Sequence, residues 1–203
     1  MKKSLWIILI IGLILVVGFF FFNFNKNDNN NSYIAQRSNT QTNQVKETNI
    51  VEKEISSFTT SIHNKEEERQ NNISITTSLL NNTIVEPSQT FSFCDTVGKA
   101  TYAKGYEEAD VYSNGELVQA LGGGNCQVST TLYNAVLAVP KFEIIERHEH
   151  SGYVPYIEEG KDAAVAYGTH DFKFTNNLKN SIKIKAENTE NEVIIKIIEL
   201  EKE

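Results

Sequence analysis

The apolar positions of the chain repeat with a helical period in its middle part and with a period of two nearer its C-terminus. Residues 66–80 place four side chains on one helical face: Ile73, Thr76, Thr77 and Leu80. Residues 127–139 place five on one face: Val128, Leu132, Ala135, Val136 and Val139. Pro140 cannot continue a helix and ends the second segment. We predict one helix over each range.

Alternation of apolar and polar residues predicts strands after Pro140. The strand-like stretches are 142–150, 153–157, 163–167 and 172–174. The strongest signal is a hairpin, in which residues 182–186 alternate with lysines, residues 188–191 turn and residues 193–198 return. Two shorter signals precede the second helix: a strand at 90–93, and a hairpin over 111–118 with Asn114-Gly115 in its turn.

These elements predict an α+β domain. An antiparallel β-sheet packs around a central helix that starts at the turn Gly122-Gly123-Gly124-Asn125-Cys126. Residues 51–62 carry apolar residues three and four positions apart, which fits a helix or an irregular lead-in. The folded domain is expected over residues 50–203.

The first 49 residues have a different character. Residues 5–22 contain no charged side chain and would span about 27 Å as a helix, close to the thickness of a bilayer core. A cleaved signal peptide is the alternative, but its apolar run is usually shorter and ends at small residues. We predict an N-terminal transmembrane helix at 5–22, a cytoplasmic stub at 1–4 and a flexible Asn-rich linker at 23–49. Lys2 and Lys3 orient the domain outward, so the cytoplasmic membrane is an expected partner.

The charge and the cysteine content make some classes of protein and site unsuitable for this chain. The whole chain carries a net charge of −7, and residues 1–50 hold five basic and two acidic side chains, so the remainder carries −10. Such an acidic domain would bind nucleic acid poorly, because phosphate contacts need Lys and Arg. Two cysteines are too few for a disulfide framework. No familiar metal or nucleotide motif is present, and we expect neither a metal nor a cofactor.

The glycine run indicates a cysteine placed for chemistry. Glycines permit a tight turn, and Asn125 is a favoured helix N-cap, which would put Cys126 in the first turn of the helix. Free N–H groups at a helix start favour the thiolate, the reactive form of cysteine. The turn residues Gly123, Gly124, Asn125 and Gln127 could supply the N–H groups that hold an oxyanion. The alternatives are a buried structural cysteine and a Cys94–Cys126 disulfide.

A cysteine nucleophile needs a base, and the histidines near residue 150 are the candidates. In a strand, His148 and His150 would share one face. His170, followed by Asp171, is another imidazole with a carboxylate beside it, and Asp162 could orient a histidine. Two surface histidines would be the plain alternative, and His63 is interpreted as surface. We expect His150 to be the base, because Ser151-Gly152 follows it at the end of the predicted strand.

Two ordered sets of residues in this chain resemble the VanW family. The central set is Phe91-Ser92-Phe93, Val97-Gly98, Thr101, Gly105-Tyr106, Ala109 and the run from Gly122 to Ala135. The second set is Glu146-Arg147-His148, His150-Ser151, Val154, Tyr156, Gly160, Asp162-Ala163, Val165, Tyr167-Gly168, Asp171-Phe172 and Phe174. The resemblance covers about residues 55–187. The chain departs from the family pattern at Cys94 and at Glu158-Glu159.

The resemblance implies an L,D-transpeptidase that acts on peptidoglycan stem peptides, with Cys126 as nucleophile. His150 is placed ahead of His148 as its base by extrapolation. The residues expected to support the site are Ser129, Thr130, Arg147, Ser151, Tyr156 and Asp162. The alternatives are a non-catalytic peptidoglycan-binding or glycopeptide-resistance accessory module, and a surface protein that serves only as an interaction platform.

Overall fold

The computed structural model describes residues 49–113 and 116–203, and the structural statements below concern these residues. The chain divides into the units 1–45 and 46–203, of which only the second is described. Its elements are β1 (Ile50–Ser61), α2 (Glu67–Leu80), β2 (Thr83–Val85), β3 (Thr90–Ser92), α3 (Phe93–Val97), η1 (Tyr102–Lys104), β4 (Glu108–Ser113), β5 (Glu116–Leu121), α4 (Asn125–Leu137), β6 (Phe142–Glu146), β7 (Lys173–Asn176), β8 (Ile182–Asn188) and β9 (Glu192–Lys202).

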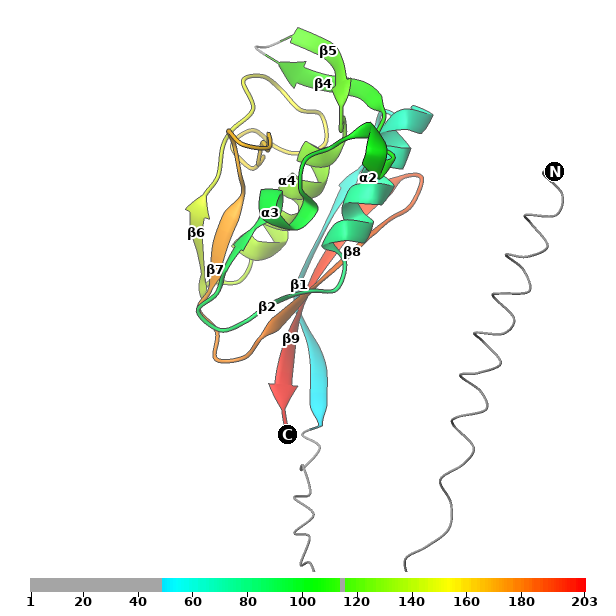
Figure 1. Ribbon diagram of the computed structural model, residues 1–203. Coiled ribbons are helices and arrows are strands. Elements are labelled where there is room, and N and C mark those ends of the chain that lie inside the picture. The colour runs from blue at the N-terminus through cyan, green and yellow to red at the C-terminus, as the bar shows by residue number, and fades with distance from the viewer. Residues whose placement is uncertain (1–48, 114–115) are drawn as a thin grey trace, which may run out of the picture. The chain divides into compact units, whose positions relative to one another are not determined.

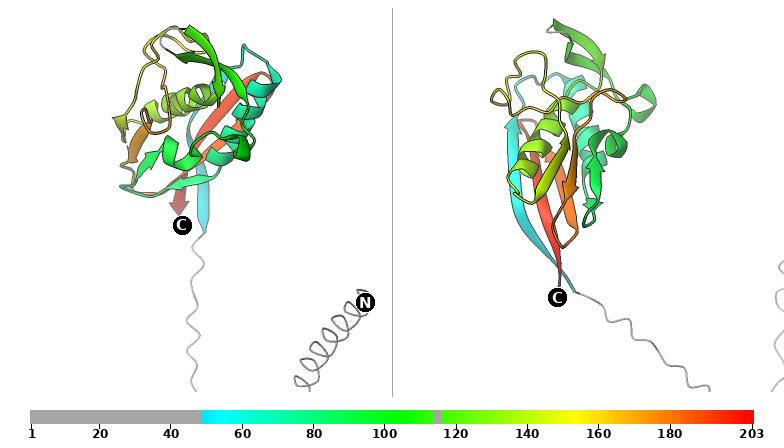
Figure 2. Two further views of the ribbon diagram at one scale, coloured as in Figure 1. Left: turned by 45° about the horizontal axis from the view of Figure 1, so that its top comes forward. Right: turned by 90° about the vertical axis from the view of Figure 1, so that its left-hand side faces the viewer.

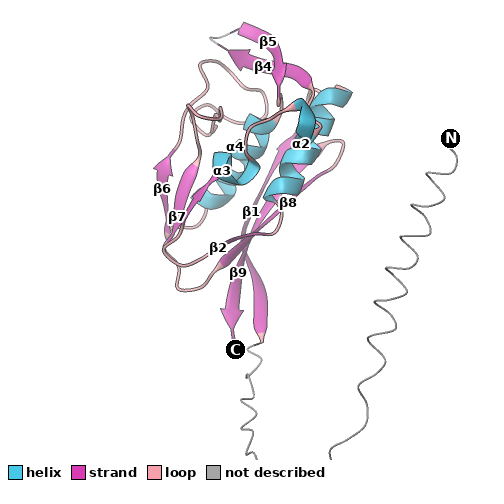
Figure 3. Ribbon diagram, viewed as in Figure 1, coloured by secondary structure: helices cyan, strands magenta, loops and turns pink. Residues whose placement is uncertain are grey.

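All strand pairs are antiparallel and form three sheets (Figures 1 and 3). The largest has the order β1-β9-β8-β2, the second has the order β3-β7-β6, and β4-β5 is a separate hairpin. Helices α2 and α4 pack on the largest sheet. Figure 2 shows α4 lying between that sheet and the β3-β7-β6 sheet. This arrangement confirms the predicted class of helices packed against antiparallel strands.

Helix α4 is the centre of the core. Four of its apolar side chains have no exposed surface: Val128, Leu132, Ala135 and Val136. On one side they face the buried row of β9, which contains Val193, Ile195 and Ile197. On another side Tyr133 meets Phe172 edge-on, with ring centroids 5.5 Å apart. Leu132, Ala135 and Val136 lie four, seven and eight positions after Val128 along one stripe of the helix, which explains why its periodicity was readable from the sequence.

The prediction for residues 51–62 was wrong, because this segment is the strand β1. A β-bulge between Glu54 and Ser56 shifts the register against β9, so the alternation of side chains breaks there. After the bulge the inward positions are Ser56, Phe58 and Thr60. The two polar ones are satisfied by α4: Ser56 Oγ donates to the Ala135 carbonyl at 2.7 Å, and the Thr60 hydroxyl lies 2.8 Å from that of Thr131.

Of the other predicted elements, some are confirmed and others are shorter than predicted or absent. The helix over 66–80 and the hairpins over 111–118 and 182–198 are confirmed as α2, β4-β5 and β8-β9. The strand expected over 142–150 ends at Glu146, and neither 153–157 nor 163–167 is a strand; the latter holds only a bridge between Ala166 and His170. The strand at 90–93 ends at Ser92, whose hydroxyl caps the short helix α3.

Among the described residues, no helix combines the length and the apolar character that a membrane crossing needs. The predicted stub at 1–4, the anchor at 5–22 and the linker up to residue 48 all lie outside the described residues.

The turn before α4 requires glycine for two different reasons. Gly124 has φ +113° and is the helix N-cap, so the prediction that Asn125 caps the helix was wrong. Asn125 is instead the first helical residue, and its side chain accepts a hydrogen bond from Thr76 at 2.7 Å. At Gly123 a Cβ atom would lie 2.8 Å from the backbone of Ala109 in β4. The turn is therefore pressed against the hairpin.

We expect Gly123→Ala to lower the free energy of unfolding by about 3 kcal/mol, because the new methyl group would meet backbone atoms that cannot rotate away. Gly168→Ala is the matched control. Gly168 has φ +87° and open space around its Cβ position, so this change should cost only about 1–2 kcal/mol of backbone strain. Urea unfolding of both variants measures the difference. Equal losses would mean that the contact with Ala109 is not a close one.

Candidate active site

Cys126 lies in the first turn of α4 and lines a cavity of about 180 Å³. The cavity is bounded by the glycine turn, the β4-β5 hairpin, the start of α2 and the loop after β6; its other lining residues are His63, Asn64, Arg69, Asp110, Val111, Leu117, Gly122, Gly124, Gln127, His150, Pro155 and Tyr156. The sulfur also contacts Val165, with both the backbone N and O of Val165 at 3.4 Å. The thiol is therefore half-buried and open to a space that a small ligand could enter.

The glycine turn is held from the side of α2. The amide nitrogen of Asn72 donates to the carbonyl oxygens of Glu107 at 2.9 Å and Gly123 at 3.1 Å. Its amide oxygen accepts from the backbone N–H of Glu107 at 2.9 Å. This buried side chain fastens the entry to the β4-β5 hairpin and the entry to α4 to the same helix. The position of Cys126 therefore depends on packed, regular structure.

His150 is the imidazole that stands beside Cys126, and both side chains line the cavity. Its Nδ1 lies 2.5 Å from Oδ2 of Asp162, which leaves Nε2 as the ring nitrogen for the thiol. The same carboxylate oxygen accepts the backbone N–H of His150 at 2.6 Å. Cys126, His150 and Asp162 thus lie in the order that a nucleophile, a base and an orienting carboxylate would need.

The electrostatics of this chain favour an imidazolium beside the sulfur. Burial works to lower the pKa of His150, but the hydrogen bond and charge of Cys126, and then those of Asp162, outweigh it and raise that pKa. Burial also works to raise the pKa of Asp162, but the backbone and side-chain hydrogen bonds from His150 outweigh it and lower that pKa. Both shifts have the sign that keeps a proton on His150 and a negative charge on Asp162.

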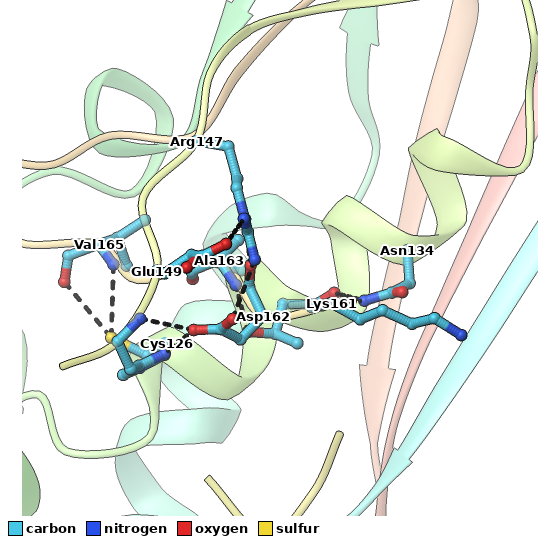
Figure 4. A network of polar contacts seen from close by, with 11 residues as sticks. Cys126, Asn134, Arg147, Glu149, Lys161, Asp162, Ala163 and Val165 are labelled. Carbon is cyan, nitrogen blue, oxygen red and sulfur yellow. Dashed lines mark hydrogen bonds and ion pairs between the residues drawn. The ribbon is translucent and has the colours of Figure 1, made fainter. Parts of the chain in front are cut away.

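Residues 161–165 carry Asp162 and Val165 and have no regular structure, so polar bonds to α4 hold them in place (Figure 4). Ser129 Oγ donates to the carbonyl of Ala163 at 2.5 Å, and Thr130 Oγ1 accepts the N–H of Ala163 at 3.0 Å. Asn134 donates to the carbonyl of Lys161 at 2.8 Å. These side chains fix the orienting carboxylate against the helix that carries the nucleophile.

Arg147 completes this support from the other side. Its Nε donates to the carbonyl of Asp162 at 2.6 Å, and its Nη2 pairs with Oδ1 of the same residue at 2.9 Å. Its Nη1 pairs with Glu149 at 2.6 Å, and its guanidinium lies over the ring of Tyr133, 5.3 Å from the centroid. Ser129, Thr130, Arg147 and Asp162, which the sequence grouped as supporting residues, therefore lie in one network.

Two of the four N–H groups expected to hold an oxyanion are engaged within the turn. The N–H of Asn125 donates to the Gly122 carbonyl at 3.0 Å, and that of Gln127 donates to the Gly124 carbonyl at 3.0 Å, so both are engaged in the turn. No described residue outside the helix accepts the N–H of Cys126 itself. This N–H at the helix start is therefore a backbone donor beside the sulfur that remains for a ligand.

Tyr156 adds a second donor to the cavity wall. Burial raises the pKa of its phenol, and the charge of Cys126 adds to that shift. Arg69 and a hydrogen bond with Thr130 oppose the shift without cancelling it. The hydroxyl therefore remains protonated and can donate a hydrogen bond within the site. Ser151, in contrast, is exposed and lines a neighbouring cavity together with Glu158 and Glu159.

Arg69 and His63 line the cavity although sequence reasoning assigned no role to the first and interpreted the second as surface. His63 is exposed, whereas Arg69 is partly buried and donates from Nη2 to Oε1 of Gln127 at 2.9 Å. A signal for Arg69 exists: it lies four residues before Ile73, on the face of α2 that is buried.

His148 is not part of this site, because β6 ends at Glu146 and the premise that both histidines share a strand face fails. Its ring packs edge-on against that of His170 at 4.4 Å, and its Nε2 lies 2.9 Å from Glu146. His170 lines a separate cavity of about 320 Å³ together with Cys94. Both cysteines are free, so the disulfide alternative is not supported.

Comparison with known proteins shows the family to which this chain belongs. The family described as "VanW like protein" matches residues 68–198, which is more than half of the chain and includes Cys126, His150 and Asp162. The chain belongs to the VanW-like family. Its match extends past β7 into the β8-β9 hairpin, so the family region contains the site and most of the sheet behind it.

Two curated proteins share the family region. One is "Uncharacterized protein YoaR" of Bacillus subtilis, 38% identical over 146 residues, which cover 72% of this chain and 48% of the relative. The other is "Vancomycin B-type resistance protein VanW" of Enterococcus faecalis, 34% identical over 113 residues, which cover 52% of this chain and 40% of the relative. The chain therefore matches less than half the length of either. No solved structure matches it.

The two free thiols should differ in reactivity. Burial, and then the charge and hydrogen bond of Asp171, raise the pKa of Cys94 to about 12, so at pH 8 only about 1 in 10⁴ of these thiols is ionised. Cys126 instead has a histidine and a helix start beside it. We expect iodoacetamide at pH 8 to label Cys126 at least about 10-fold faster, and Cys94 labelling to rise steadily above pH 10. Peptide mapping by mass spectrometry measures both rates, and faster labelling of Cys94 would contradict the assignment.

Proposed function

We propose that this protein modifies peptidoglycan as a cysteine L,D-transpeptidase. The observation that carries the proposal is the arrangement of Cys126, His150 and Asp162: Cys126 at a helix start and His150 line one cavity, and Asp162 holds His150 from behind. The geometry supplies a nucleophile, a base held in one tautomer by a carboxylate, and a backbone N–H beside the reacting sulfur. Membership of the VanW-like family supports a role in cell-wall chemistry, since one relative is named for vancomycin resistance.

The reaction needs two acyl transfers. The Cys126 thiolate attacks the carbonyl carbon between the third stem residue and a terminal D-alanine, and the N–H of Cys126 with the Tyr156 hydroxyl stabilises the oxyanion. His150, protonated by the thiol, returns that proton to the departing amine of D-alanine, which leaves a thioester. An amine from a neighbouring stem then attacks the thioester, loses a proton to His150 and releases the thiol, forming a 3–3 crosslink. Water in place of the amine would make the enzyme a carboxypeptidase.

We further propose that residues 5–22 anchor the chain in the cytoplasmic membrane, with the domain outside. The orientation of the domain suits such a tether. Hydrogen bonds from Gln127 to Thr60 and to the carbonyl of Ser61 put the start of α4 at the far end of β1 from Ile50. Twelve extended residues span roughly 40 Å, so the site would face away from the point where the tether enters.

The deciding experiment is mass spectrometry of the protein incubated with a tetrapeptide stem. We expect an increase in mass equal to the tripeptide acyl group, located on Cys126. Cys94→Ala is the matched control and should acylate like the parent, whereas Cys126→Ala should not. If no adduct forms on Cys126 while the protein still binds the peptide, the non-catalytic peptidoglycan-binding module is the better description.

The choice of base predicts a difference between two neighbouring histidines. His150→Ala removes the imidazole that contacts the thiol, and we expect the single-turnover acylation rate to fall by about 10²–10⁴-fold. His148→Ala changes the cluster around Cys94 and His170 and should leave the rate within about 3-fold of the parent. Circular dichroism of both variants checks their folding. Acylation of a folded His150 variant at the parent rate would rule out His150 as the base.

A further inference from the structure

Arg69 is a cation in the wall of the cavity that has no role in the arrangement of Cys126, His150 and Asp162. It comes from the first turn of α2 and lines the same space as Cys126. Among the described residues no ion pair engages its guanidinium; Tyr156, Cys126, Asp110 and Glu66 act on it only by longer-range attraction. Burial has the largest effect on the pKa of Arg69 and lowers it, because it disfavours the charged form. An arginine nevertheless stays ionised in proteins, so the charge is retained at a cost.

The hydrogen-bonding capacity of Arg69 is mostly unused. Only Nη2 has a protein acceptor among the described residues, Oε1 of Gln127 at 2.9 Å, and Nε is buried with no acceptor. Gln127 is itself 1% exposed and donates from its amide nitrogen to Thr60 and to the carbonyl of Ser61. The guanidinium is therefore aimed by a fixed partner, whereas Nη1 and the second N–H of Nη2 remain available to an anion.

Asp110, the carboxylate that lines this cavity, is engaged elsewhere. It accepts hydrogen bonds from Gln119 on the facing strand of the hairpin and from Asn64 at 3.5 Å. Arg69 is thus a positive group that forms no ion pair with a described carboxylate, in a space that also holds Cys126. Such an arrangement suits a ligand that brings its own negative charge within a few ångströms of the bond to be attacked.

We propose that Arg69 binds the free C-terminal carboxylate of the donor peptide and so selects donors that carry a single residue after the scissile bond. This inference rests on the proposed function. In a tetrapeptide stem, the carboxylate of the last residue is separated from the scissile carbonyl by only one amide nitrogen and one α-carbon. A carboxylate on Arg69 therefore positions that carbonyl near Cys126. Arg69 is a specificity-determining residue, and a longer or amidated donor loses its contact.

The test compares one donor in two forms. The probes are the tetrapeptides L-Ala-γ-D-Glu-L-Lys-D-Ala and its meso-diaminopimelate counterpart, each as the free acid and as the C-terminal amide. Binding is measured by calorimetry on the full-length Cys126→Ala chain, which cannot form a thioester. We expect at least one acid to bind about 10- to 100-fold more tightly than its amide, the usual range for a lost charge-assisted hydrogen bond.

Variants then assign this preference to Arg69. In Arg69→Gln the ratio of acid to amide affinity should fall to about 1, chiefly through weaker binding of the acid. Arg69→Lys keeps the charge without the fork and should keep part of the ratio. Lys65→Gln is the matched control: it removes one positive charge at an exposed position just before α2, outside the cavity, and should leave the ratio unchanged. Circular dichroism confirms that each variant is folded.

The outcomes separate this inference from the proposed function. A ratio near 1 in the parent background, or one that Arg69→Gln does not change, overturns the carboxylate site even if Cys126 acylates normally. An equal loss of acylation for acid and amide in Arg69→Gln also overturns it, because that result would make Arg69 an oxyanion donor. If binding discriminates as expected but no acylation of the Cys126 thiol occurs, the carboxylate site stands and the transpeptidase proposal fails. A failure of both probes to bind overturns the site.

Discussion

A single buried carboxylate, that of Asp162, organises the part of the site that regular secondary structure does not reach. It is 6% exposed and receives three donors: the backbone N–H and Nδ1 of His150, and Nη2 of Arg147. A buried charge without such partners would cost several kcal/mol. The loop after β6 and residues 161–165 must therefore take the one arrangement in which all three donors reach the Asp162 carboxylate. The placement of His150 beside Cys126 follows from satisfying Asp162. Cys126 is held by packing and His150 by hydrogen bonds.

Much of the fold could be predicted because its buried faces are apolar and regularly spaced. The buried row of α4 and the isoleucines of the β8-β9 hairpin repeat with the periods of their elements. Strand β1 could not be recognised in this way, since Ser56 and Thr60 occupy inward positions and a bulge interrupts the alternation. Their hydroxyls are compensated by α4, a partner some 70 or more positions away in the chain. A hydrophobic period does not register such compensation.

The sequence identified a site residue only where that residue's role depends on its immediate neighbours in the chain. Three glycines before a helical segment identified Cys126, because a tight turn leaves a local signature. His150 was preferred to His148 on the premise of a strand that in fact ends at Glu146, and the contact that distinguishes the two is the long-range bond to Asp162. Arg69 was missed for the same reason: the partner that aims it, Gln127, lies 58 positions further along the chain.

The pairing of β1 with β9 has an architectural consequence. The N–H of Glu203 donates to the carbonyl of Asn49 at 3.0 Å, so the polypeptide enters and leaves the domain at one point. A unit with adjoining ends can be spliced into a loop of a larger protein without stretching either, which suits a family region that covers less than half of the curated relatives. It also permits circular permutation, because residues 49 and 203 could be joined by a short linker.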